Sequence, residues 1–194
     1  MGDKSVQKKK YIVETARQVF VEKGFKTVTM KDIVEACGIS RGGLYLYFEN
    51  TAQIFAAVLK MEREENGDVF AESIKEDATA ADILILFLKE QKKELVRKKN
   101  TLTQAIYEYY FENNLPKKEN VLKKQFDSAV KIIERLIEAG VEAGEFACED
   151  FAGTARNIMY VLEGLKIASQ TMGITAEAVD REIMYILKSL GVEE

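Results

Sequence analysis

Uninterrupted helical periodicity is the feature that most constrains how this chain can fold. The 194 residues include one proline, Pro116, and 12 glycines. Because proline breaks helix interiors, its scarcity leaves long stretches in which helices can run. Apolar residues recur every three or four positions in nearly every segment, whereas sustained two-residue alternation is absent. We therefore expect an all-α fold.

Capping residues mark where the predicted helices begin. Thr29 opens a capping-box pattern, Ser40 can cap a short helix, and Asn50 or Thr51 can cap the next one. Pro116 suits a first helical turn, where its missing N–H costs nothing. The predicted helices span residues 6–23, 29–37, 41–47, 52–76, 79–98, 101–113, 116–143, 150–172 and 175–190.

Composition excludes several classes of protein. The chain is 47% hydrophobic and 31% charged, which is too apolar for a disordered protein and too charged for a membrane protein. Histidine is absent, which excludes Ser-His-Asp and Cys-His catalysis and His-ligated zinc. Cys37 and Cys148 form no CxxC pattern, so we expect neither a disulfide framework nor a metal site, and no cofactor.

Two further features concern location. The longest apolar run, residues 83–88, is about a third of the length that spans a bilayer. The first residues lack the apolar core of a secretory signal. We expect a soluble, cytoplasmic protein without membrane contact.

Charge is distributed unevenly along the chain. Residues 1–48 carry nine Lys and Arg against five Asp and Glu, a net +4, whereas the whole chain carries −4. A basic head on an acidic body predicts that the head meets an anion, although a solvated basic tail explains the same charges.

One segment, residues 29–48, has the pattern of a helix-turn-helix. It reads TMKDIVEACGISRGGLYLYF, in which Gly38 supplies the permissive backbone for a tight turn between two short helices. Ile33, Ile39 and Leu44 would hold the two helices together. This geometry presents the second helix to the major groove of DNA. Helix pairs that bind nothing are also common, so the spacing alone leaves both interpretations open.

A wider pattern makes the interpretation specific. Residues 12–54 resemble the DNA-binding head of the TetR family of bacterial transcriptional regulators. The resemblance implies an N-terminal three-helix head, joined by a helix to a helical body that binds a small molecule and dimerises. The matching residues are Ile12, Ala16, Phe20, Gly24, Thr29, Ile33, Ala36, Gly38, Ile39, Ser40, Gly42, Leu44, Tyr45, Tyr47, Phe48 and Ile54.

Three positions depart from the family pattern. Val34 stands where the family usually has Ala, Thr51 where it usually has a phosphate-contacting Lys, and Gly43 where it often has a polar residue. Few side chains of the second helix therefore remain to read bases. Loss of specific DNA binding, leaving a helical protein-interaction module, is the alternative function that these departures motivate.

The candidate DNA-binding residues are base readers and backbone contacts. The Arg41 guanidinium can bridge guanine O6 and N7, and Leu46 can touch a thymine methyl. The resemblance implies that Thr29, Tyr45 and Tyr47 contact phosphates, with core packing the alternative for Tyr45. The full set is Thr29, Lys31, Ser40, Arg41, Gly42, Gly43, Tyr45, Leu46, Tyr47 and Thr51, with charge from the lysines at 8–10 nearby.

The last two long predicted helices are apolar on more than one face. In the helix at 150–172, one stripe runs through Ile158 and Leu162 and another through Tyr160, Gly164 and Ile167. One chain of this size covers such helices poorly, so we expect them to pair with their copies in a homodimer. A fully internal helix pair is the alternative. A two-fold dimer places two recognition helices about 34–36 Å apart on a near-palindromic operator.

Aromatic residues of the body predict a small-molecule site. Residues 107–111 hold four aromatics in five positions, more than one helix face can carry. Glu108 and Glu112 could orient a ligand there. We expect an apolar or amphiphilic effector, and carboxylates beside aromatics suit a cationic amphiphile; ordinary core packing is the alternative for each residue. The candidates are Phe87, Tyr107, Tyr110, Phe111, Phe126, Val130, Asn157 and Tyr160.

Together these features predict a ligand-responsive, homodimeric DNA-binding transcriptional regulator, most simply a repressor. Residues 1–50 would form the helix-turn-helix domain and residues 51–194 the ligand-binding and dimerisation domain. The expected partners are a double-stranded DNA operator, a small-molecule effector and a second copy of the chain. An enzyme is not expected, because the sequence has no metal-ligand spacing, phosphate-binding loop or nucleophile elbow.

Overall fold

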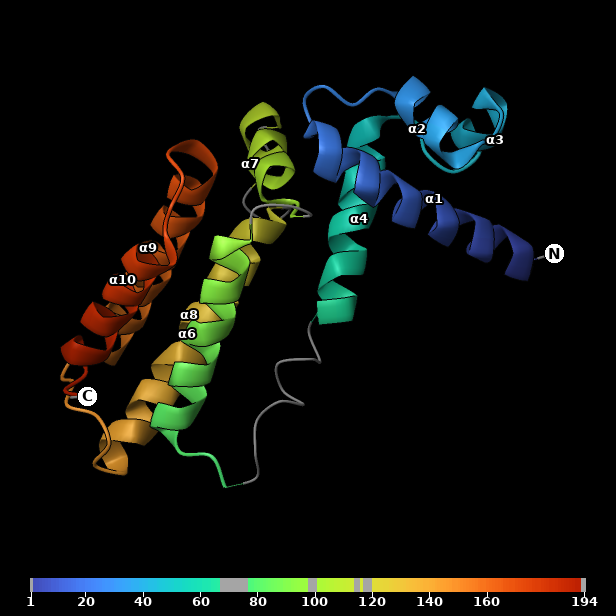
Figure 1. Ribbon diagram of the computed structural model, residues 1–194. Helices are drawn as coiled ribbons and strands as arrows, with labels where there is room; N and C mark the ends of the chain where they lie inside the picture. Colours follow the sequence, from blue (N-terminus) through green and yellow to red (C-terminus); the bar gives the residue numbers. More distant parts are fainter. Residues whose placement is uncertain (1, 67–76, 98–100, 114–115, 117–119, 193–194) are drawn as a thin grey trace. The chain divides into compact units, whose positions relative to one another are not determined.

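The computed structural model describes residues 2–66, 77–97, 101–113, 116 and 120–192, and this part of the chain contains helices and no strands. The predicted all-α fold is therefore confirmed. The helices, shown in Figure 1, are α1 (Gly2–Lys23), α2 (Met30–Cys37), α3 (Arg41–Tyr45), α4 (Thr51–Asn66), α6 (Ala80–Val96), α7 (Thr103–Glu112), α8 (Val121–Glu142), α9 (Phe151–Thr171) and α10 (Ala176–Ser189).

The helices belong to two compact units. The head unit comprises the described parts of residues 1–72 and 99–114, and so contains α1, α2, α3, α4 and α7. The bundle unit comprises the described parts of residues 73–98 and 115–194, with α6, α8, α9 and α10. These structural units differ from the division at residue 50, because α4 and α7 pack against α1. The functional division itself stays a prediction.

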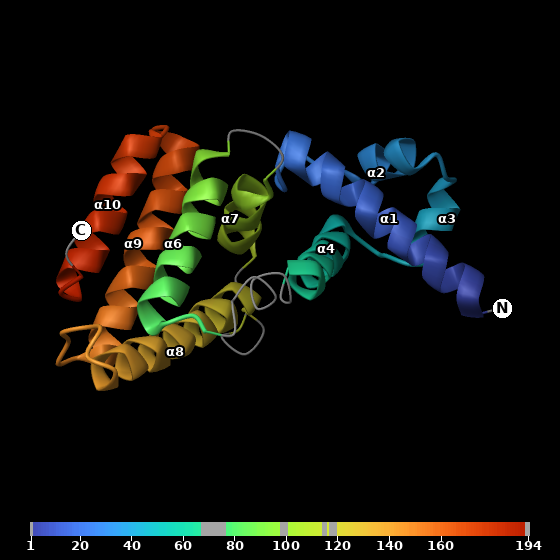
Figure 2. The same cartoon turned by 60° about the horizontal axis from the view of Figure 1, so that its bottom comes forward.

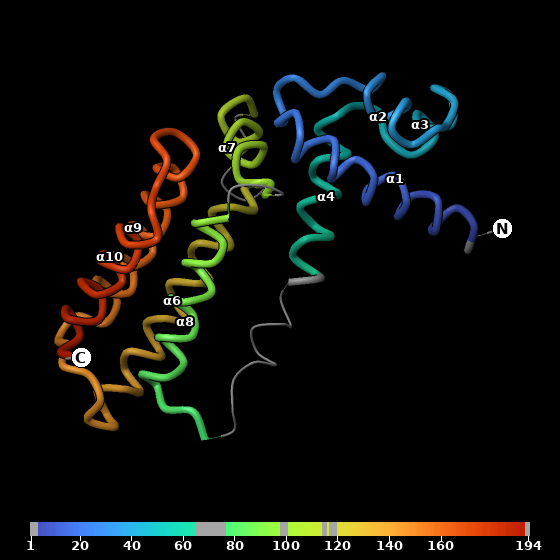
Figure 3. The backbone as a smooth tube through the Cα atoms, viewed as in Figure 1, coloured from blue at the N-terminus to red at the C-terminus, as the bar shows by residue number. Residues whose placement is uncertain are grey.

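Apolar residues at helical spacing build the core of the head unit. Helix α1 packs against both α2 and α4, and Figure 3 lets the chain be followed from α1 through the two short helices into α4. Phe20 of α1, Leu44 of α3 and Phe55 of α4 are fully buried there. Burial of a large apolar side chain stabilises a fold by about 1.5–3 kcal/mol. The core thus holds the helix-turn-helix against α1 and α4.

The bundle unit is built around α8 and α9, which make the most extensive helix contact in it, with α6 and α10 packed alongside (Figure 2). Its core includes Leu88 of α6, Ile137 of α8, Leu162 of α9 and Leu190 after α10. Close packing extends to the backbone, because a Cβ built on Gly140 would overlap the ring of Phe146.

Two predicted helix starts are settled by hydrogen bonds. The Asn50 side chain, and not that of Thr51, caps α4 by accepting the N–H of Gln53 at 2.9 Å. The prediction that Pro116 opens the next long helix is wrong. The Asn120 side chain caps α8 through the N–H of Lys123, so the helix begins at Val121. The predicted extension of the helix at 52–76 beyond residue 66 lies outside the described residues.

Candidate nucleic-acid interface

A capping box fixes the start of the helix-turn-helix. The Thr29 hydroxyl accepts a hydrogen bond from the Asp32 N–H, and the Asp32 carboxylate accepts one from the Thr29 N–H at 2.8 Å. Lys23, at the end of α1, forms an ion pair with the same carboxylate. Hydrogen bonds from Lys23 and Thr29 hold the pKa of Asp32 well below its usual range. The beginning of α2 is therefore tied electrostatically to α1.

The turn between α2 and α3 has the predicted geometry. Gly38 adopts a left-handed conformation at φ +61°, and the N–H of Ile39 reaches back to the Val34 carbonyl at 3.3 Å, which closes α2. The Ser40 hydroxyl then accepts the Gly43 N–H at 3.1 Å and caps α3. Because Leu44 is fully buried, α3 is anchored by its inner side and leaves the rest of its surface free.

The exposed surface of α3 carries few side chains. A Cβ built on Gly42 would meet no atom within 4 Å. The Arg41 guanidinium lies 5.7 Å from the ring centroid of Tyr45, close enough for a cation–π contact. Leu46, directly after the helix, is 83% exposed. The surface thus combines the open backbone at Gly42 with the Arg41 guanidinium and the exposed Leu46 side chain.

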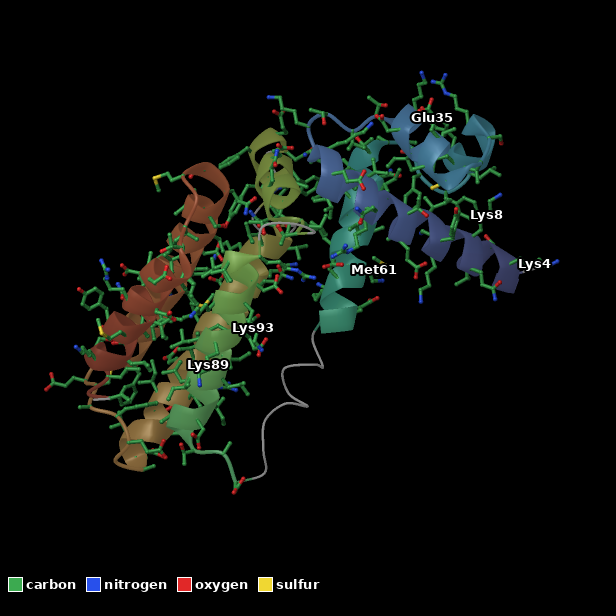
Figure 4. All side chains as sticks on the ribbon, in the orientation of Figure 1. Lys4, Lys8, Glu35, Met61, Lys89 and Lys93 are labelled. Atoms are coloured by element: carbon green, nitrogen blue, oxygen red, sulfur yellow. The ribbon has the colours of Figure 1, made fainter. Side chains whose placement is uncertain are left out.

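The N-terminal turns of α1 lie beside α3. Ser5 donates a weak hydrogen bond to the Tyr47 hydroxyl at 3.5 Å, and the Lys8 ammonium lies 4.0 Å from the Cβ position of Gly43. Figure 4 labels Lys4 and Lys8 on this half of α1. The sequence prediction missed Ser5, because it began the helix at residue 6; the absence of any helix breaker in residues 3–5 was the available signal.

The remaining candidates of the predicted DNA surface have mixed environments. Thr29 and Ser40 use their hydroxyls as helix caps. Lys31 is exposed and pairs with Glu35 at 3.6 Å. Tyr47 and Thr51 are half-buried, and Thr51 is the first residue of α4.

The two carboxylates predicted to orient a ligand contact Lys26, in the turn that follows α1. The Glu108 carboxylate accepts a hydrogen bond from the backbone N–H of Lys26 at 2.9 Å. Glu112 pairs with the Lys26 ammonium at 2.9 Å. These carboxylates therefore give no support to a cationic effector.

The predicted ligand-binding residues divide between the two units. Tyr107, Tyr110 and Phe111 belong to α7 in the head unit, where the rings of Tyr107 and Phe111 are 6.4 Å apart. In the bundle unit, Val130 is buried, Phe87 packs against the core, and Asn157 is exposed. Among the bundle residues, the rings of Phe126 and Tyr160 are in contact, with their centroids 5.1 Å apart.

Phe126 and Tyr160 line a hollow of about 370 Å³ between α8 and α9. We refer to it as the α8–α9 hollow. Leu122 adds a further apolar wall. Charged and amide groups surround these apolar groups, so the hollow offers both apolar and polar contacts. Its lining residues are Asn120, Leu122, Lys123, Phe126, Asp127, Arg156, Tyr160 and Glu163.

Apolar side chains are also exposed on α9 and α10. Tyr160 is 60% and Ile167 44% exposed on α9, and Tyr185 is exposed on α10. Gly164 lies between the two α9 residues, and a Cβ built on it would meet no atom within 4 Å. The stripe through 160, 164 and 167 thus faces away from the core of the bundle unit, whereas Ile158 and Leu162 are buried in it.

The described residues include neither a metal-binding group of side chains nor a helix that could span a membrane. In residues 2–66, 77–97, 101–113 and 120–192, no group of three or more His, Cys, Asp and Glu side chains is placed to hold a metal ion. None of the helices described above is both long and apolar enough to cross a membrane.

Known proteins match both parts of the chain. The family described as "Bacterial regulatory proteins, tetR family" matches residues 12–58, and the one described as "Tetracyclin repressor-like, C-terminal domain" matches residues 83–180. The uncharacterized HTH-type transcriptional regulator YfiR of Bacillus subtilis is 34% identical over 138 residues, which cover 70% of this chain and 66% of that protein. The fatty acid metabolism regulator protein of Bacillus subtilis is 27% identical over 135 residues, 69% of this chain and 68% of that protein.

A solved structure shares the whole fold. The TetR transcription regulator from Haloarcula marismortui superposes with a TM-score of 0.81 at 16% identity, over 96% of this chain and 97% of that chain. The helix-turn-helix geometry, the two matching family descriptions and the curated relatives agree. The chain belongs to the TetR family of bacterial transcriptional regulators.

Proposed function

We propose that this chain is a repressor that binds a near-palindromic DNA operator as a homodimer, with an affinity that responds to an apolar or amphiphilic effector. The exposed surface of α3 carries the proposal. The backbone at Gly42 is open next to Arg41, Leu46 is exposed, and the Lys8 ammonium lies 4.0 Å from the Cβ position of Gly43. That surface suits close approach to a polyanionic groove.

Arg41 is the principal base reader in this proposal. Its stack on Tyr45 limits the rotamers of the guanidinium, so that less entropy is lost when the fork bridges guanine O6 and N7. Leu46 meets a thymine methyl. The Thr29 hydroxyl is already hydrogen-bonded to Asp32. The backbone N–H groups in the first turn of α2 therefore donate to the phosphate in place of that hydroxyl. The hydroxyls of Tyr45, Tyr47 and Thr51 and the Lys31 ammonium supply the other backbone contacts.

The dimer forms through α9 and α10. Support comes from the exposed stripe of Tyr160, Gly164 and Ile167 on α9 and from Tyr185 on α10. Large apolar side chains exposed in one stripe are typical of a surface that is covered by a partner. The glycine lets a second helix approach closely. A two-fold pair then presents two copies of α3 to successive turns of DNA.

The effector binds at the α8–α9 hollow. The rings of Phe126 and Tyr160, with centroids 5.1 Å apart, supply apolar surface. The charged groups of the lining are Arg156, Glu163 and the ion pair of Lys123 with Asp127. Because the lining carries charges of both signs, these features suit an amphiphile without fixing the sign of its polar end. A relative is named fatty acid metabolism regulator protein, so the effector class that we favour is a long-chain carboxylate whose polar end meets Arg156.

Capture of genomic DNA tests the central part of the proposal. Fragments of the source genome are retained on purified protein at physiological salt and sequenced. A few fragments sharing a short inverted repeat are expected. Sequence-blind retention would contradict the repressor function and favour the helical protein-interaction module.

Calorimetry tests the effector site. Titration with palmitic acid is expected to show binding that the Phe126→Ala variant weakens by about tenfold or more, because the ring contributes buried apolar area. The Ile132→Ala variant, which changes an exposed α8 residue outside the hollow, should bind as the unchanged protein does. Equal binding by both variants would exclude the hollow as the fatty-acid site.

A further inference from the structure

Helix α7 connects the two units through the chain itself. It lies in sequence between α6 and α8 of the bundle unit, joined to them by residues 97–102 and 113–120. Nevertheless it belongs to the head unit, where it contacts α1. The chain therefore passes from the bundle unit into α7 and back again.

Glu108 is the α7 side chain that contacts the backbone of the turn that follows α1. Its carboxylate accepts the Lys26 N–H at 2.9 Å and the side-chain N–H of Gln104 at 2.7 Å. Partial burial raises the pKa of Glu108, but hydrogen bonds from the Lys26 amide, Gln104 and the Phe25 amide outweigh burial and leave the pKa below its usual value. The carboxylate is thus held ionised over two successive backbone amides, an arrangement that favours an anion.

The backbone at Gly24 is shaped around this carboxylate. Gly24 has φ +75°, and a Cβ built on it would lie 2.6 Å from a Glu108 oxygen. Next to the polar contact, the Tyr109 ring packs against the rings of Phe25 and Phe55, with centroid distances of 5.0 Å and 5.1 Å. The turn at residues 24–28 is therefore held by α7 through both a carboxylate and a ring.

We infer that Glu108 is a positioning residue for DNA binding: by holding the turn at residues 24–28, it sets how α2 and α3 meet the operator. That turn leads directly into the Thr29 cap of α2, so its position determines where the helix-turn-helix begins relative to α1. Glu108 contacts no DNA itself. The inference rests on the proposed operator binding, and adds a residue of α7 that supports it without touching DNA.

Three variants of the full chain test the inference. Glu108→Ala removes the acceptor, Glu108→Gln keeps an oxygen for the Lys26 N–H, and Glu112→Ala removes only the exposed pair with the Lys26 side chain one turn away. Affinity is measured for a captured genomic fragment and for a random duplex, at a temperature where circular dichroism shows every variant folded. Hydrogen exchange of the Lys26 amide reports the contact directly.

Glu108→Ala is expected to weaken binding to the captured fragment by about tenfold, a size typical of coupling between sites. Its Lys26 amide should exchange faster, whereas affinity for the random duplex and the salt dependence should not change. Glu108→Gln should restore most of the affinity, and Glu112→Ala should match the unchanged protein.

Two other results would overturn the inference. One is a Glu108→Ala variant that binds the fragment as tightly as the unchanged protein. The other is an equal loss on fragment and random duplex, which would indicate general damage to the head. If the proposed function itself is wrong, the unchanged protein will bind the fragment and the random duplex equally. That result would overturn the inference as well, and it is distinguishable from the two results above.

Discussion

Arg41 is the side chain on which base recognition depends most. Since the neighbouring α3 positions are glycines, its loss has no nearby replacement. Arg41→Ala is expected to weaken operator binding by about 1–3 kcal/mol while leaving random DNA almost unaffected. Arg41→Lys is the control, because it keeps the charge but not the bidentate fork. Fluorescence anisotropy with both duplexes measures the difference, and an equal loss on both would make Arg41 a phosphate contact.

Gly24 and Gly38 form a matched pair for testing the contact with Glu108. Both have positive φ, at 75° and 61°, so an alanine at either costs about 1–2 kcal/mol in backbone strain. Only at Gly24 would the new Cβ displace the Glu108 carboxylate, at a further cost of about 1.5–3 kcal/mol. Urea denaturation should therefore show a larger loss of unfolding free energy for Gly24→Ala. Equal losses would mean that the carboxylate contributes little.

The pattern of neighbouring residue types predicts contacts between residues close in sequence, but not contacts between distant segments. The Thr29–Asp32 capping box and the Ser40 cap follow from residue types three positions apart, and the structure confirms them. The contact of Glu108 with Lys26 spans 82 positions, and nothing in either local segment specifies it. Local pattern therefore suggests a ligand as the partner of Glu108 and Glu112. In the structure both carboxylates contact Lys26.

At the scale of the element, the start of α2 makes the head unit sensitive to acid. Asp32 has a lower pKa in the folded head than in the unfolded chain, where an Asp titrates near about 3.9. Folding therefore favours its ionised form, and this stabilisation is present at neutral pH and lost as pH falls from about 5. Asp32→Asn should make the unfolding free energy fall less steeply between pH 6 and pH 3, as measured with urea. Parallel pH profiles for the two proteins would contradict this role.

Side-chain caps made the starts of α2, α3 and α10 predictable. For α8 the prediction relied on Pro116, which suits a first helical turn, and did not consider the Asn120 side chain as a cap. The structure selects Asn120, whose side chain bonds to the Lys123 N–H.

The aromatic cluster of α7 shows what periodicity leaves open. It correctly indicated that four aromatics cannot share one face, since Tyr109 is buried and Phe111 is exposed. It could not indicate which neighbours would cover the buried ring. Those neighbours are Phe25 and Phe55 of the head unit, so Tyr109 is a core residue there.

For the whole molecule, the proposed dimer makes a matched pair of surface substitutions informative. Ile167 on α9 is 44% exposed within the proposed interface, and Ile132 on α8 is 64% exposed outside it. Ile167→Glu is expected to give monomers in light scattering, because pairing would bury an unpaired carboxylate. Ile132→Glu should remain dimeric. A dimeric Ile167→Glu protein would place the interface elsewhere.

The central claim is that two copies of α3, held by one two-fold dimer, read the two halves of an inverted repeat. The most direct measurement compares affinity for a captured operator with affinity for the same duplex carrying about five extra base pairs between its half-sites, half a helical turn. The account predicts a loss of at least about a hundredfold, towards the affinity for random DNA, because the dimer can no longer reach both halves. Unchanged affinity for the lengthened duplex would contradict it.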